Sequence, residues 1–195
     1  YNNCVSCSFG TLAGGCGNTA CGEYSFVGGG TGSAAEGEYS VVVGGHTLSA
    51  YGACSFIGGG HLNRTNGSAA GVMTGCANRA NGACSVVVGG ELNCTLAGIH
   101  TVVVGGCNNC TIGASNYSLI GGGHANKICA AAYASIAGGS GNRICGNAGF
   151  IGAGSNNSLS AAHTCSAILG TGIASVSANM LHTFSLFLSS LPTSD

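Results

Sequence analysis

A branched apolar residue recurs eleven times along this chain at intervals of 15 to 17 residues, each time followed by Gly-Gly or a close variant. The series is Leu12, Val27, Val42, Ile57, Val72, Val87, Val103, Ile120, Ile136, Ile151 and Ile168. A fixed period of this length predicts a solenoid, in which each coil buries its apolar face only against neighbouring coils. Gly-rich chains without a period are usually disordered, so the repeat is what makes the 38 glycines among 195 residues compatible with an ordered fold.

The low charge content narrows the choice of partner. Charged residues make up 5% of the chain and the formal net charge is −1, so no electrostatic footprint for nucleic acid is present. No apolar run approaches the roughly 20 residues of a membrane span, and we expect no membrane insertion. With so few charges a slender chain associates readily, so we expect an assembly to cover much of its surface.

One coil can be described position by position if the branched apolar residue is called column 3. Column 2 then contains Phe26, Val41, Phe56, Gly71, Val86, Val102, Leu119 and Phe150, and column 4 contains Gly28, Val43, Gly58, Met73, Val88, Val104, Gly121 and Gly152. These two columns compensate in volume, because Phe accompanies Gly, Val accompanies Val, and Gly71 accompanies Met73. Side chains two apart on a strand share a face, so columns 2 and 4 fill one dry space while column 3 points into the coil.

A second strand is predicted after the Gly-Gly turn. Its column 11 is small or apolar and joins column 3 inside the coil, whereas columns 10 and 12 are mostly polar, which is the alternation of a half-buried strand. Column 10 contains every basic residue of the chain: Arg64, Arg79, Lys127 and Arg143. Column 9 is Asn in eight coils, at Asn18, Asn63, Asn78, Asn93, Asn109, Asn126, Asn142 and Asn157. Stacked Asn side chains predict a hydrogen-bonded ladder along that column.

Columns 2 and 4 are apolar although they lie outside the coil. A continuous stripe of this kind cannot face water over eleven coils, so we expect identical chains to pack their stripes around a shared axis. The predicted interface consists of Phe26, Val41, Phe56, Val86, Val102, Leu119 and Phe150. At about 4.8 Å per coil the assembly would be a rod on the order of 50 Å long.

The 13 cysteines are scattered among the columns, and we expect most of them to act as small buried hydrophobes. Two pairs occupy one column in successive coils, namely Cys94 with Cys110 and Cys129 with Cys145. Their Cα atoms would lie about 4.8 Å apart, within the range for a disulfide. Whether these pairs are oxidised depends on the compartment in which the chain assembles.

Column 7 collects residues of metal-ligand type, with His46, His61 and Cys76 in three successive coils. Imidazole and thiolate suit zinc or iron, and a threefold axis would triple each ligand. The alternative is a solvated turn that tolerates any polar residue.

Columns 10 and 12 supply the surface candidates Tyr51, Arg64 and Arg79, for which plain solubility is the alternative. The carboxylates are Glu23, Glu36, Glu38, Glu91 and Asp195. They form no catalytic constellation, and we predict neither an enzyme nor a cofactor.

The unit, as in Ser40-Val41-Val42-Val43-Gly44-Gly45 or in Ser85 to Asn93, resembles two related groups of repeats. One is the head of YadA-like trimeric autotransporter adhesins, and the other is the Gly-Gly-x-x-Asn repeat of phage and giant-virus tail fibres. Both imply an all-β, left-handed parallel β-roll of about 15 residues per coil and about 11 coils, assembled as a homotrimer. The resemblance covers residues 10–174, and the stretch from Asn179 to Asp195 is similar to the segment that closes viral fibre repeats.

We therefore divide the chain into an incomplete N-terminal coil (residues 1–9), a β-roll domain (10–174) and a closing segment (175–195) before a further domain. The chain begins without Met, and we expect it to be part of a longer protein. The resemblance implies a virion fibre that contributes to binding of a host glycan or protein.

The first alternative is a bacterial trimeric adhesin head at the cell surface. A solenoid that binds ice or a small ligand and a β-helix polysaccharide depolymerase are the further alternatives.

Overall fold

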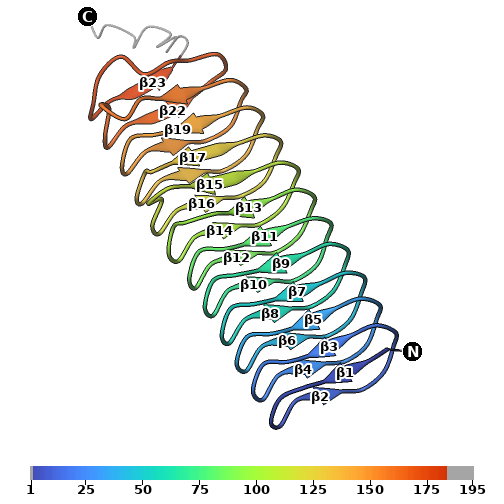
Figure 1. Cartoon of the computed structure of the whole chain (residues 1–195). Coiled ribbons are helices and arrows are strands. Elements are labelled where there is room, and N and C mark those ends of the chain that lie inside the picture. The colour runs from blue at the N-terminus through green and yellow to red at the C-terminus, as the bar shows by residue number, and fades with distance from the viewer. Residues whose placement is uncertain (1, 184–195) are drawn as a thin grey trace, which may run out of the picture.

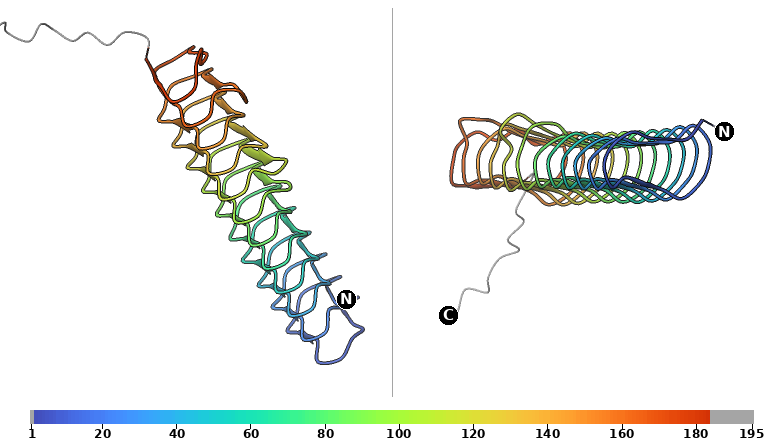
Figure 2. Two further views of the ribbon diagram at one scale, coloured as in Figure 1. Left: turned by 90° about the vertical axis from the view of Figure 1, so that its left-hand side faces the viewer. Right: turned by 60° about the horizontal axis from the view of Figure 1, so that its bottom comes forward.

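A computed structural model describes residues 2–183 of the chain. These residues form an all-β solenoid of about 12 coils with parallel strands, which confirms the predicted all-β solenoid (Figure 1). The coils stack along one axis in both views of Figure 2. Among the described residues no helix is long and apolar enough to cross a membrane.

Each coil contributes one short strand to each of two parallel sheets. The first sheet consists of β1 (Cys4–Val5), β3 (Thr19–Ala20), β5 (Ala34–Ala35), β7 (Ser49–Ala50), β9 (Arg64–Thr65), β11 (Arg79–Ala80), β13 (Cys94–Thr95), β15 (Cys110–Ile112), β17 (Lys127–Cys129), β19 (Arg143–Ile144) and β21 (Ser158–Leu159). The second sheet consists of β2 (Thr11–Leu12), β4 (Phe26–Val27), β6 (Val41–Val42), β8 (Phe56–Ile57), β10 (Gly71–Val72), β12 (Val86–Val87), β14 (Val102–Val103), β16 (Leu119–Ile120), β18 (Ser135–Ile136), β20 (Phe150–Ile151), β22 (Ala167–Leu169) and β23 (Leu181–Thr183).

The register between coils places each column in line, as predicted. In the second sheet Val42 pairs with Ile57, and in the first sheet Ala50 pairs with Thr65. Columns 3 and 11 form the interior, where residues such as Val42 and Ile128 are completely buried. Columns 2 and 4 therefore lie on the outer face of the second sheet, and columns 10 and 12 lie on the outer face of the first sheet.

The buried Asn column stabilises one corner through backbone contacts. The Oδ1 atom of Asn93 accepts a hydrogen bond from the Asn109 amide at 2.9 Å, and its Nδ2 atom donates to the carbonyls of Gly89 and Gly106 at 2.8 and 2.9 Å. The predicted ladder therefore exists, but most of its bonds join side chain to backbone. Only the pair Asn142 and Asn157 is joined side chain to side chain among the described Asn residues.

The corners require left-handed backbone conformations. Gly60 has a φ of +95°, and a Cβ atom at this position would collide with the carbonyl oxygen of Gly75 in the next coil. Two further corner positions adopt left-handed φ with side chains present, as at Leu62 (φ 56°) and Tyr39 (φ 55°). The amides of Leu62 and Tyr39 donate to the backbone carbonyls of His46 and Glu23 in the preceding coil, so each left-handed residue is held by a bond between coils.

The solenoid extends over both ends of the expected repeat domain. At the N-terminal end β1 pairs with β3, so residues 4–5 add a strand to the first sheet. At the C-terminal end β23 pairs with β22 in register, with Ala167 beside Leu181. This strand lies within the segment 175–195 that we expected to close the repeats. Residues 184–195, including Asp195, lie outside the described residues.

We expect Asn93→Ala to lower the free energy of unfolding by about 3 kcal/mol, because one amide and two carbonyls lose a buried partner. Denaturant titration followed by circular dichroism measures the change. Asn66→Ala is the matched control, since the exposed Asn66 side chain accepts a single bond from Arg64. A similar loss of stability in both variants would contradict the assigned role of the ladder.

Candidate functional site

The main candidate is the apolar stripe formed by columns 2 and 4 on the outer face of the second sheet. In the single chain the side chain of Val43 is 49% exposed, that of Val104 is 44% exposed and that of Phe150 is 41% exposed. Phe26, Val41, Phe56, Val86 and Val102 are half-buried, and Leu119 is exposed. Every residue of the predicted interface therefore lies on one continuous face.

The volume compensation read from the sequence has a direct structural cause. A Cβ atom added to Gly58 would collide with the carbonyl oxygen of Met73 in the next coil and lie 3.3 Å from Cε1 of Phe56, and one added to Gly71 would lie 3.1 Å from Cε of Met73. The large side chain thus lies along the strand over the space that its glycine neighbour leaves open. Alternating large and small residues consequently produce an even apolar surface, as two valines side by side do.

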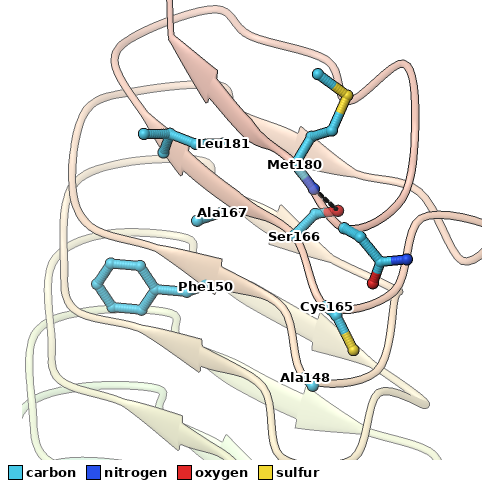
Figure 3. A pocket seen from close by; sticks show the side chains of 8 residues that line it. Ala148, Phe150, Cys165, Ser166, Ala167, Met180 and Leu181 are labelled. Atoms are coloured by element: carbon cyan, nitrogen blue, oxygen red, sulfur yellow. Dashed lines mark hydrogen bonds between the residues drawn. The ribbon is translucent and has the colours of Figure 1, made fainter.

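A hollow of about 460 Å³ lies at the C-terminal end of this stripe. Figure 3 shows Phe150, Ala167 and Leu181 on successive strands, with Ala167 as the small residue between two large ones. The Met180 amide donates to Ser166 Oγ at 3.4 Å and holds the last coil against β22. The hollow lies at the edge of the stripe, where Phe150 and Leu181 meet the corner residues Cys165, Asn179 and Met180.

The outer face of the first sheet carries the predicted surface candidates. Arg64 and Arg79 are lateral neighbours on β9 and β11. The guanidinium carbon of Arg64 lies 4.7 Å from the ring centroid of Tyr51, and its Nε donates to Asn66 at 2.8 Å. The structure therefore brings the three candidates together, with Arg64 in contact with an aromatic face.

Besides the two sheets, the backbone of column 7 forms a third parallel ladder, in which one residue per coil pairs with the next along the corner after Gly-Gly. The rings of His46 and His61 stack with centroids 4.9 Å apart, and Cys76 Sγ lies 3.7 Å from His61 Nδ1. Within residues 2–183, however, no group of three or more His, Cys, Asp or Glu side chains is placed to hold a metal ion. The residues of the metal hypothesis, His46, His61 and Cys76, are therefore adjacent, but they do not form a complete ligand set within one chain.

The cysteines differ from the expectation in one respect. None of the eleven cysteines outside the Cys94–Cys110 disulfide is fully buried in the described chain, because the columns that contain them face outward or form corners. Cys94 and Cys110 are bonded, with Sγ atoms 2.04 Å apart and Cα atoms 4.6 Å apart. Cys129 and Cys145, which have the same lateral arrangement, are free thiols.

Two stacks of exposed aromatic rings were missed by the sequence reasoning. Phe9, Tyr24 and Tyr39 stack with centroids 4.8 and 5.0 Å apart. Partial burial, followed by the charge of Glu38, raises the pKa of the Tyr39 phenol.

His100, Tyr117 and Tyr133 form a second stack in the same column. The signal was available, because each of these residues lies two positions before a column 2 residue. No protein-family model matches this sequence, and no curated protein matches it.

We expect Cys129 to be alkylated more slowly than free cysteine at neutral pH, because burial and then Cys145 raise its pKa. The raised pKa leaves less thiolate, so the rate should reach its plateau at a higher pH. Cys145→Ala should shift the profile back toward lower pH, while the effect of burial remains. Alkylation rates mapped by mass spectrometry test this, and an unchanged profile in Cys145→Ala would contradict the coupling.

Proposed function

We propose that the chain is a trimeric segment of a fibre, a rigid rod that contributes to attachment to a host surface. The single observation that carries this proposal is the exposed apolar stripe, which runs from β4 to β20 and is interrupted at β18, where column 2 is Ser135 and column 4 is Ala137. Three copies that pack these stripes around a shared axis would remove them from water. The rest of the surface would stay outside the interface.

The proposed mechanism is mechanical and multivalent. Strands bonded coil to coil make a stiff spacer, and threefold symmetry presents each outward site three times, so that weak contacts combine into avidity. The resemblance to viral fibre repeats supports a location on a virion, with host glycan or protein as the partner.

A bacterial adhesin head is the second candidate, because the same coil and the same stripe would serve there. Its distinguishing feature would be a coiled-coil stalk attached to the rod. A polysaccharide depolymerase is a further alternative, and it would need catalytic carboxylates. The carboxylates of Glu23 and Glu38 are the candidates for that role, and they lie at a corner beside the stacked rings of Tyr24 and Tyr39.

Sedimentation of the purified chain tests the proposed trimer. We expect the unmodified chain to sediment as a trimer and Val104→Glu to sediment as a monomer, because a carboxylate in the stripe would be buried without a partner. Leu92→Glu is the matched control, since Leu92 is 51% exposed at a corner outside the stripe. A monomeric unmodified chain, or equal dissociation in both variants, would overturn the shared-axis assembly.

A further inference from the structure

The charges of this chain are segregated onto different parts of the coil. All four basic residues lie in column 10, on the outer face of the first sheet. Arg64 is the lateral neighbour of Arg79, and Lys127 is the lateral neighbour of Arg143. Like charges placed directly side by side in a sheet are destabilising, so this arrangement costs stability unless an anion offsets it.

The two basic pairs flank a groove. Between them column 10 contains Cys94 and Cys110, joined by the disulfide. Two hollows of about 250 and 310 Å³ adjoin each other here and share Cys94, Leu96 and Asn108 in their walls. Arg79 lines the first hollow and Lys127 lines the second. The groove therefore has an uncharged floor and a cation at each end.

We propose that this groove binds a linear acidic oligosaccharide. Arg79 and Lys127 are three coils apart, or about 14 Å at about 4.8 Å per coil, a distance that a short oligosaccharide spans and a single sugar does not. The cations would bind two anionic groups of the ligand. Leu96 and Asn108 between them offer an apolar surface and an amide, which suit the faces and hydroxyls of sugars.

The spacing favours a saccharide over a nucleic acid. A nucleic-acid strand carries a phosphate at every nucleotide and binds through many phosphate contacts. The floor between Arg79 and Lys127 offers it Cys94, Leu96, Asn108 and Cys110, none of which is a cation, so the intervening phosphates would find no cation. An acidic polysaccharide with neutral sugars between its anionic groups matches this pattern.

The groove is compatible with the proposed assembly. The proposed binding of an oligosaccharide in it rests on the proposed attachment function. The groove lies on the first sheet, whereas the apolar stripe lies on the second, so three chains packed through their stripes would each present one groove outward. Glu36 is an acidic residue on the same face, but it lies two coils before Arg64. Threefold presentation would strengthen binding to a repetitive surface polysaccharide.

Isothermal titration calorimetry of the full chain tests the groove with size-defined oligosaccharides of chondroitin sulfate, hyaluronan and polysialic acid. We expect at least one of them to bind with one site per chain, and neutral chitin oligosaccharides of equal length not to bind. The double variant Arg79→Gln/Lys127→Gln should weaken binding by about tenfold or more, because both charge-assisted contacts are lost. Circular dichroism checks that this variant keeps its fold.

A charge-relocation variant is the matched control. It combines Arg79→Gln and Lys127→Gln with Thr31→Lys and Ser140→Lys, two exposed positions of column 7, and so keeps the net charge. Binding should stay weak in this variant. Equal binding by it and the unmodified chain, no binding of any of the three acidic probes, or tighter binding of a single-stranded oligonucleotide would each overturn the proposal. Sedimentation of the same sample separates the two proposals, because a trimer that binds no acidic probe would overturn the groove alone.

Discussion

Each coil donates backbone hydrogen bonds to the next coil, and these bonds hold residues of one column directly beside each other from β1 to β22. The strands are mostly two residues long, too short to be stable singly, so the order of any coil depends on its neighbours. Longer coils keep this register. Val103 pairs with Ile120 and Cys110 pairs with Lys127 across an interval of 17 residues. The residues in excess of the usual 15 are accommodated at the corner near Gly113. Insertions are therefore absorbed at corners, while the interior columns stay aligned.

This register turns a sequence interval into a lateral contact. Side chains one coil apart face each other whether or not the contact is favourable, which is why rings stack, two cysteines are bonded and arginines adjoin. Favourable columns, such as the buried Asn ladder, stabilise the stack. An unfavourable one, such as Arg64 beside Arg79, costs stability unless an anion offsets it.

The interior could be predicted from the sequence because it obeys one simple rule per column. Column 3 is branched and apolar from Leu12 to Ile168, column 11 is small or apolar, and Val42 and Ile128 are buried as that pattern requires. The contacts of the outer columns depend on details that a pattern does not contain. Asn93 bonds to backbone instead of to other Asn side chains, and Cys129 forms no disulfide with Cys145 although the two are lateral neighbours like Cys94 and Cys110. The groove escaped notice because Leu96 and Asn108 approach each other only after the coil has closed.

The two outer faces differ in chemistry, and the difference follows from the flattened coil. One face is even and apolar because large and small residues alternate, as Phe56 does with Gly58, and an even apolar surface packs closely against copies of itself. The other face carries all the cations and the two hollows between them. Because the side chains of columns 2 and 4 point away from those of columns 10 and 12, the residues of one face can differ in chemistry without affecting the other face. A chain with this division can lengthen by adding coils, each of which extends the proposed assembly surface and the outward surface by the same step.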